Sequence, residues 1–251
     1  MKPLLRWLGL VLLALLALQL FFVGRIAAMA VLDPESTSFQ RSEAWAQIAS
    51  TGELRWRQQW VPYGQISDHL KRAVIASEDD GFVGHDGVEW TAIEKAWERN
   101  AQAETWAQAQ AAKAQARTPD APPTPVRAAK IRGGSTITQQ LAKNLLLSGE
   151  RTLLRKSQEF VLTLLLEKLL NKQRILEIYL NSVEWGNGVF GAEAAAQHYF
   201  GKSAARLSAA EAARLAVMLP APKRFEKLGN SAYLAGRTRL IVGRMRSAEL
   251  P

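Results

Sequence analysis

The longest uninterrupted apolar run lies near the N-terminus. Trp7 to Gly24 is 18 residues without a charge, and Gln19 is its one clearly polar side chain. As a helix this run would reach roughly 27 Å, about the hydrocarbon thickness of a bilayer. Lys2 and Arg6 precede it, and the positive-inside rule then favours a cytoplasmic N-terminus. The pattern predicts a cytoplasmic segment at 1–6, a transmembrane helix at 7–24 and an exported remainder.

A cleaved signal peptide is the alternative interpretation of this segment. Ala28-Met29-Ala30 has the small residues of a cleavage site, but the apolar run exceeds the ~7 to 15 residues of a usual signal core. A retained anchor is therefore favoured. The polar residues that follow predict a juxtamembrane stalk at 25–50, which leads into one globular domain at 51–251.

Beyond the stalk, apolar positions recur with the period of a helix. Those from Ile66 to Ser77 share one face, Ser67 is a candidate N-cap, and this helix should end near Glu78. The same period predicts further helices at 91–116, 137–148, 152–170, 174–181, 192–199, 209–219 and 231–246. Only Arg55 to Pro62 alternates as an extended segment does, so the predicted fold class is mainly α.

Residues 98–130 depart from globular composition. Ala101 to Arg117 is mostly Ala and Gln, which favours a helix, whereas Thr118 to Pro125 contains four prolines, which exclude one. This segment is predicted to be a mobile insertion that has no chemistry of its own.

The composition narrows the chemistry. No Cys and three His remove thiolate zinc sites, cysteine nucleophiles and disulfides, and leave little for a histidine metal cluster. The formal charge of +9 favours an anionic partner, and nucleic acid, anionic lipid and phosphorylated substrates all qualify on charge alone. An exported domain argues against nucleic acid. A reaction here must therefore rest on carboxylates, hydroxyls and cations.

Three consecutive carboxylates, Glu78, Asp79 and Asp80, stand where the first predicted helix of the domain ends, and His85 follows them. Their mutual repulsion and the negative end of the helix dipole both disfavour the anion. Both effects would raise the pKa of one carboxyl toward that of a general base. An acidic turn with a structural histidine is the plainer alternative.

A Gly-Gly pair opens the stretch from Gly133 to Asn144 just before a predicted helix. Its hydroxyls would stand beside unpaired helix N-terminal amides, which suit a phosphate, and Lys143 adds a cation. A capping box between Thr136 and Gln139 is the alternative that needs no ligand, and the two can hold together.

A charge cluster begins the next predicted helix. Arg155 and Lys156 lie four and three residues before Glu159, so the three share one face. A surface salt bridge is the default explanation for an exposed helix. From Leu153 to Leu170, however, the helix is apolar over most of its circumference, which predicts burial and hence a paired or functional cluster. Glu167 is an alternative buried ion partner.

Five ordered segments resemble the motifs of the peptidoglycan glycosyltransferases, which comprise the glycosyltransferase modules of class A penicillin-binding proteins and their single-domain relatives. The segments are AVIASEDDGFVGHDG at 73–87, GGSTITQQLAKNLLL at 133–147, RKSQE at 155–159, RILEIYLN at 174–181 and LAVMLPAP at 215–222. The resemblance extends from about Trp60 to Phe225. Asn181 to Gly186 is similar to the monofunctional, membrane-anchored subgroup, so no penicillin-binding domain is expected.

The resemblance implies a lysozyme-like α-helical fold with an amphipathic jaw near the membrane, and polymerisation of lipid II. Glu78 would be the general base for the 4-hydroxyl of the acceptor N-acetylglucosamine, with inversion at the donor and release of undecaprenyl pyrophosphate. Glu159 would orient the acceptor or assist the pyrophosphate. The donor sugar and phosphates would be held by Ser135, Thr136, Gln139, Gln140, Lys143, Arg155 and Lys156. Asp79 and His85 join this substrate-binding set by shaping the first motif.

The implied partners are lipid II, the growing lipid-linked strand, the membrane, and cell-wall synthesis and division proteins. The implied location is the inner membrane, as a single-pass protein with its catalytic domain in the periplasm. No residue constellation requires a cofactor or metal, although carboxylates near a pyrophosphate leave Mg²⁺ or Mn²⁺ open. Gly81 departs from the basic residue that many family members have there, which puts one anion contact in doubt.

Two other functions stay open at this point. A lysozyme-like enzyme that cleaves peptidoglycan would share the fold and an essential glutamate, but would not need a Gly-Gly-Ser-Thr helix start beside clustered cations. A non-catalytic anchored scaffold would tolerate replacement of Glu78 by Gln.

Overall fold

The computed structural model describes residues 2–117, 134–147, 149–150, 152–229 and 231–251. The chain divides into two compact units, one formed by 1–87 with 136–251 and the other by 88–135. The second unit contains the helix α4, Trp90–Arg117, which confirms the helix predicted at 91–116. The proline-rich part of the predicted insertion lies outside the described residues.

The first unit is mainly α-helical, as predicted. Its helices are α1 (Lys2–Ala28), α2 (Ser38–Thr51), α3 (Asp68–Glu78), α5 (Ile137–Leu146), α6 (Leu153–Leu169), α7 (Lys172–Ser182), α8 (Ala192–Phe200), α9 (Ala209–Met218), α10 (Pro222–Leu228) and α11 (Ala232–Arg244). Short 3-10 turns stand at Tyr63–Gln65, Phe82–Gly84 and Ala204–Arg206. The sequence did not predict α2, which is too polar to show a clear helical period, or α10, which is too short to show one.

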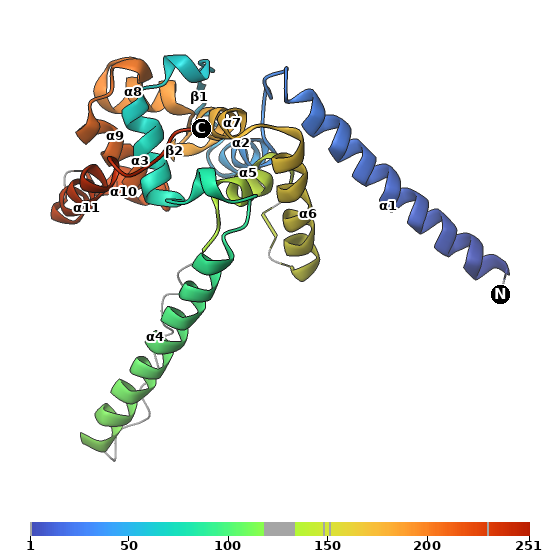
Figure 1. Cartoon of the computed structure of the whole chain (residues 1–251), viewed down its shortest axis with the longest axis horizontal. Helices are drawn as coiled ribbons and strands as arrows, with labels where there is room; N and C mark the ends of the chain where they lie inside the picture. Colours follow the sequence, from blue (N-terminus) through green and yellow to red (C-terminus); the bar gives the residue numbers. More distant parts are fainter. Residues whose placement is uncertain (1, 118–133, 148, 151, 230) are drawn as a thin grey trace. The chain divides into compact units, whose positions relative to one another are not determined.

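Two helix clusters share one core. α3 packs against α9 and α11, and α5 packs against α2, α6 and α7 (Figure 1). The face predicted for α3 is buried, because Leu70, Ala73 and Val74 are wholly inaccessible. Trp185 and Tyr179 are among the largest fully buried side chains. Burial of such aromatic and aliphatic surface is the main stabilising term for this fold.

A small sheet pairs a strand near the start of the globular sequence with two strands that follow α7. β1 (Arg57–Gln58) pairs in parallel with β3 (Val189–Phe190), which pairs antiparallel with β2 (Glu184–Gly186). Gly188 has φ +73°, and a Cβ there would collide with the carbonyl oxygen of Arg55, so the close approach requires glycine. The extended segment predicted at 55–62 is confirmed in part. Strands of two or three residues carry no period, which is why β2 and β3 were missed.

Part of the predicted stalk is a helix packed on the domain. Within 25–50, the Ser38 hydroxyl donates to the Leu145 carbonyl of α5 at 3.1 Å. The Gln40 amide is buried and donates to the Ser182 carbonyl of α7 at 3.2 Å. Thr37 closes a capping box with Gln40, which fixes where α2 begins. The stalk interpretation is therefore wrong for α2, whose polar side chains are used as tertiary contacts.

The helix α1 contains the predicted transmembrane segment. It spans 27 residues and is the one helix among the described residues that is long and apolar enough to cross a bilayer. Its single polar interior residue is paired, because the side-chain amides of Gln19 and Gln158 of α6 exchange two hydrogen bonds of 3.1 and 3.2 Å. α1 and α6 are thus in contact at Gln19, toward the C-terminal end of the apolar run.

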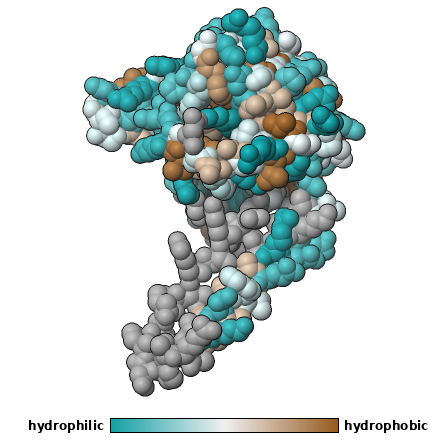
Figure 2. Space-filling view, turned by 90° about the vertical axis from the view of Figure 1, so that its left-hand side faces the viewer, coloured by the Kyte–Doolittle hydropathy of each residue, from teal (hydrophilic) through white to brown (hydrophobic). Residues whose placement is uncertain are grey.

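The prediction that α6 is buried is wrong. Leu153 is 89% exposed and Leu154 is 83% exposed, and Phe160, Val161 and Leu164 are also exposed. The buried face contains Glu159, Thr163, Leu162 and Leu166 instead. By contrast, the face with α8, α9 and α11 is mostly hydrophilic, with scattered apolar residues (Figure 2). An α6 that contacts a membrane helix can leave its apolar side toward lipid, where water does not penalise it.

Candidate active site

The first candidate residue, Glu78, ends α3 and is partly buried. Burial raises the pKa of its carboxyl, and the neighbouring charge of Asp79 raises it further. Hydrogen bonds from Gln140 and Ser77 act in the opposite direction. The pKa of Glu78 is thus raised, as predicted, but the main cause is burial rather than repulsion between carboxylates. Asp80, the third carboxylate, is exposed and pairs with Arg244 at 3.1 Å.

Gln140 connects Glu78 with α7. Its amide Nε2 donates to Glu78 Oε2 at 3.1 Å, while its Oε1 accepts from the Tyr179 hydroxyl at 2.9 Å. Tyr179 is fully buried, and burial together with the charges of Glu78 and Asp79 raises its pKa well above the ordinary value. The tyrosine therefore stays a hydrogen-bond donor and orients the amide, with the nitrogen toward the carboxylate.

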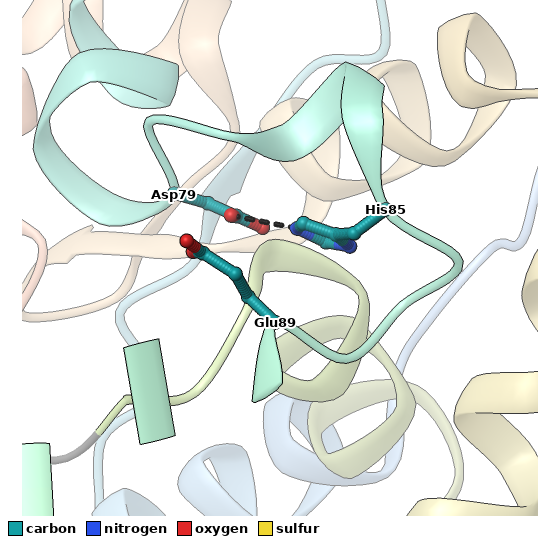
Figure 3. A group of neighbouring side chains, drawn as sticks. All are labelled: Asp79, His85 and Glu89. Atoms are coloured by element: carbon teal, nitrogen blue, oxygen red, sulfur yellow. Dashed lines mark hydrogen bonds and ion pairs between the residues drawn. The ribbon is translucent and has the colours of Figure 1, made fainter. Parts of the chain in front are cut away.

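Asp79 and His85 hold the first motif together (Figure 3). Asp79 is buried, and one carboxylate oxygen contacts His85 Nε2 at 2.9 Å while the other accepts from the Ile137 backbone N–H at 2.9 Å. The backbone N–H of Gly87 donates to His85 Nδ1 at 3.1 Å, so Nε2 carries the ring proton. Asp79 thereby joins the end of α3 to the start of α5.

The second motif forms the capping box that the sequence offered as an alternative. The Thr136 hydroxyl accepts from the Gln139 N–H at 3.2 Å, and the Thr136 N–H donates to Gln139 Oε1 at 3.2 Å. The same hydroxyl donates to the Gly87 carbonyl at 2.6 Å. Both side chains are buried, and their interactions position α5. Their role as substrate ligands stays a prediction, as does that of exposed Ser135, which precedes the cap.

The third motif is a buried carboxylate between two cations. Glu159 is 3% exposed; Arg155 contacts it at 3.1 Å, and Lys156 forms a second ion pair with it. Glu167 is not their partner. Its Oε1 accepts from Lys172 at 2.8 Å and from the Thr138 hydroxyl at 2.6 Å. Lys172 also donates to the His85 carbonyl, which ties α6 and α7 to the first motif.

A cavity of about 450 Å³ brings several of these residues together. Gln140, Lys143 and Arg155 line it, and so does Tyr179. The lining also includes Ser38, Phe39, Ser42, Glu43, Asn144, Leu147, Gly149, Val183, Glu184, Leu219 and Pro222. Glu78 and Glu159 are each bonded to a lining residue, through Gln140 and Arg155 respectively. Two cations thus line the cavity, and Glu78 and Glu159 lie one hydrogen bond behind its lining, an arrangement that suits transfer from an anionic leaving group.

Sequence reasoning missed three features of this cavity. Tyr179 lies inside the motif RILEIYLN, but nothing in the spacing indicated its bond to Gln140. Glu43 comes from the predicted stalk. Burial raises the pKa of Glu184 to about 7, a feature that composition gives no sign of.

The fold and site define a mainly α-helical enzyme with carboxylates and cations around one cavity and an apolar N-terminal helix. Residues 45–112 and 120–246 match the model of the transglycosylase family. The chain belongs to this family of glycosyltransferases.

Similar proteins named biosynthetic peptidoglycan transglycosylase cover nearly the whole chain. The one from Paraburkholderia xenovorans (strain LB400) is 50% identical over 98% of this chain and 94% of its own length. The one from Herminiimonas arsenicoxydans is 50% identical over 100% of this chain and 99% of its own. The one from Bordetella pertussis (strain Tohama I / ATCC BAA-589 / NCTC 13251) is 49% identical over 93% of this chain and 88% of its own length.

Proposed function

We propose that this peptidoglycan glycosyltransferase polymerises lipid II, with Glu78 as its general base. The observation that supports this most directly is the Glu78 carboxyl itself, whose raised pKa and bond to cavity-lining Gln140 suit proton transfer beside a bound sugar. Membership of the transglycosylase family and the names of the relatives supply the substrate class.

The reaction follows from these groups. Glu78 accepts the proton of the 4-hydroxyl of the acceptor N-acetylglucosamine as that oxygen forms a bond to the donor's anomeric carbon. The bond from that carbon to the pyrophosphate oxygen breaks, undecaprenyl pyrophosphate leaves, and the linkage inverts from α to β. Glu159 is proposed to act as the second carboxylate, orienting the acceptor or supporting departure of the pyrophosphate.

The cations are proposed to stabilise the leaving group. Arg155 and Lys143 line the cavity, and Lys156 is 54% exposed beside Glu159. Positive charge fixed where negative charge develops lowers the barrier without reorganisation. Because Glu159 pairs with two cations, one net positive charge remains at this end of α6 for a phosphate.

The membrane arrangement is proposed from α1 and α6. Lys2 and Arg6 favour a cytoplasmic N-terminus, which places the catalytic domain on the periplasmic side of the inner membrane. The exposed apolar side of α6, next to α1, would then meet lipid and bring the cavity close to a membrane-bound substrate. Partners among cell-wall synthesis and division proteins stay a prediction from the resemblance.

Glu78→Gln tests the function. The full chain with this substitution should lose at least about a hundredfold in labelled lipid II polymerisation, the scale of a lost general base, while unfolding at the wild-type temperature or above. Asp80→Asn, an exposed carboxylate two residues away, is the matched control and should keep activity. Wild-type turnover by Glu78→Gln, or fragments released from finished peptidoglycan by the wild type, would overturn the assignment. The same polymerisation assays with a chelator present test whether the reaction requires Mg²⁺ or Mn²⁺.

A further inference from the structure

A second charged group lines the same cavity at residues that the reaction above does not use. Glu184 of β2 and Glu43 of α2 both line it. Lys223 of α10 pairs with Glu43 and also contacts Glu184 Oε1 at 3.4 Å. One cation is thus shared between two carboxylates.

Glu184 is held rigidly. It begins β2, and the next residue, Trp185, is fully buried with its indole N–H donating to the Leu215 carbonyl at 3.1 Å. The Glu184 side chain is 8% exposed. Its Oε1 atom is buried, and Lys223 contacts it at 3.4 Å, which is longer than an ordinary hydrogen bond between ions. A buried carboxylate oxygen with only a distant donor costs free energy, which a ligand that supplies a closer donor would recover.

The electrostatic surroundings agree with this geometry. Burial is the largest cause of the raised pKa of Glu184, and the charges of Glu43 and Glu226 add to it. Lys223 acts in the opposite direction but is also bound by Glu43. Glu226 itself accepts from the Asn187 N–H at 2.9 Å and contacts His198 at 3.1 Å. The carboxyl therefore shares its positive partner, Lys223, with Glu43, and a further hydrogen-bond donor or cation from a ligand would favour its ionised form.

We propose that Glu184, with Glu43 and Lys223, forms a subsite that binds a hydrogen-bond-donating nitrogen of the glycosyl substrate, either an amide N–H or an ammonium group. This inference rests on the proposed function, because it takes the cavity to hold the lipid-linked substrate. Lys143 and Arg155 supply the cations for the phosphate end in the same lining, so the cavity contains complementary groups for an anion and for a nitrogen donor. The subsite contributes to substrate affinity and takes no part in bond breaking.

The test uses two variants that separate the two nitrogen sources. Glu184→Leu keeps the volume but removes the acceptor, and should raise KM for lipid II about tenfold with kcat nearly unchanged. Glu184→Gln keeps an acceptor oxygen but removes the charge. It should leave KM within about twofold if the donor is an amide, and raise KM as Leu does if the donor is an ammonium group. If the donor is an ammonium group, lipid II with its free amino group acetylated should bind the wild-type protein as weakly as unmodified lipid II binds Glu184→Leu.

The matched control is Glu193→Gln. Glu193 is also buried, but it does not line this cavity and both its oxygens are bonded within the domain, to Gln197 at 3.0 Å and Ala204 at 2.7 Å. The KM of Glu193→Gln for lipid II should stay at the wild-type value.

Binding of labelled lipid II is also measured in a Glu78→Gln background, with thermal unfolding as the check of the fold. A folded Glu184→Leu protein that binds lipid II within twofold of the parent overturns the subsite. Continued polymerisation by Glu78→Gln alone would instead overturn the proposed base.

Discussion

The Tyr179 hydroxyl donates to Gln140 Oε1 at 2.9 Å, and this bond decides which end of the amide faces Glu78. A glutamine amide can present either its oxygen or its nitrogen to a neighbour. Because the tyrosine occupies the oxygen, the nitrogen donates to the carboxylate at 3.1 Å. The amide therefore favours the anionic base, and partly offsets the effect of burial on the pKa of Glu78.

Tyr179→Phe should weaken catalysis through its effect on Gln140. Loss of the hydroxyl leaves the amide free to rotate, so the bond to Glu78 is made for less of the time and the pKa of Glu78 rises further. We expect kcat to fall about five- to tenfold, the scale of one hydrogen bond, and the acid limb of the pH–rate profile to move to higher pH.

Tyr199→Phe is the matched control for this prediction. The Tyr199 hydroxyl donates to the Trp185 carbonyl at 2.7 Å, so the substitution also deletes a tyrosine hydrogen bond, but not one to Gln140. It should lower stability without moving the pH profile. Equal profiles for Tyr179→Phe and wild type would show that the tyrosine does not act on the base.

Arg155 and Lys156 should differ in how much stability they contribute. The Arg155 side chain is 17% exposed and Lys156 is 54% exposed, and both pair with the buried Glu159. Removing the more buried partner leaves more of the carboxylate charge uncompensated. Arg155→Gln should cost about 2 kcal/mol in the free energy of unfolding, and Lys156→Gln less than about 1 kcal/mol. Denaturant titration measures both, and equal losses would contradict the assigned geometry.

The sequence predicted the parts of this fold that rest on local periodicity. The helices α3, α5 and α9 follow from the spacing of apolar residues, and the caps Ser67 and Thr136 follow from Ser or Thr before the first turn of α3 and α5. The burial of α6 was predicted wrongly. An apolar circumference indicates removal from water, and lipid satisfies that requirement as well as a protein core does.

The candidate site was predictable where residues lie within one motif. Glu159 with Arg155 and Lys156 follows from helical spacing alone. The contacts of Asp79 with His85 and Ile137, and of Gln140 with Tyr179, join segments far apart in the sequence, so no local pattern encodes them. The acidic pair Glu43 and Glu184 was missed for the same reason.

Glu184 should make stability depend on pH near neutrality. Its pKa rises from an ordinary 4.5 to about 7 in the folded protein, so the folded state holds the proton more tightly than the unfolded state does. Its contribution is fully present below about 4.5 and is lost as pH rises through about 7. The loss is at most roughly 3 kcal/mol.

Glu184→Gln removes this titration. The free energy of unfolding of wild type, relative to Glu184→Gln, should therefore fall between pH 5 and pH 8, roughly the range in which the carboxyl ionises. Glu53→Gln changes an exposed carboxylate, and its free energy of unfolding should vary with pH in parallel with that of wild type. If the Glu184→Gln and wild-type curves also run parallel, the carboxyl is not perturbed by its burial.

The exposed apolar side of α6 should lie in contact with lipid. Because the chain has no Cys, a single Leu154→Cys substitution gives one labelling site, at a side chain that is 83% exposed. An environment-sensitive fluorophore there should brighten and shift to shorter wavelength when the full chain is reconstituted into vesicles, since its surroundings change from water to hydrocarbon. Leu240→Cys on α11, at a side chain that is 58% exposed, is the control and should keep the spectrum of a label in water. The same water-like spectrum at position 154 would exclude lipid contact, and the exposed leucines of α6 would then need a protein partner.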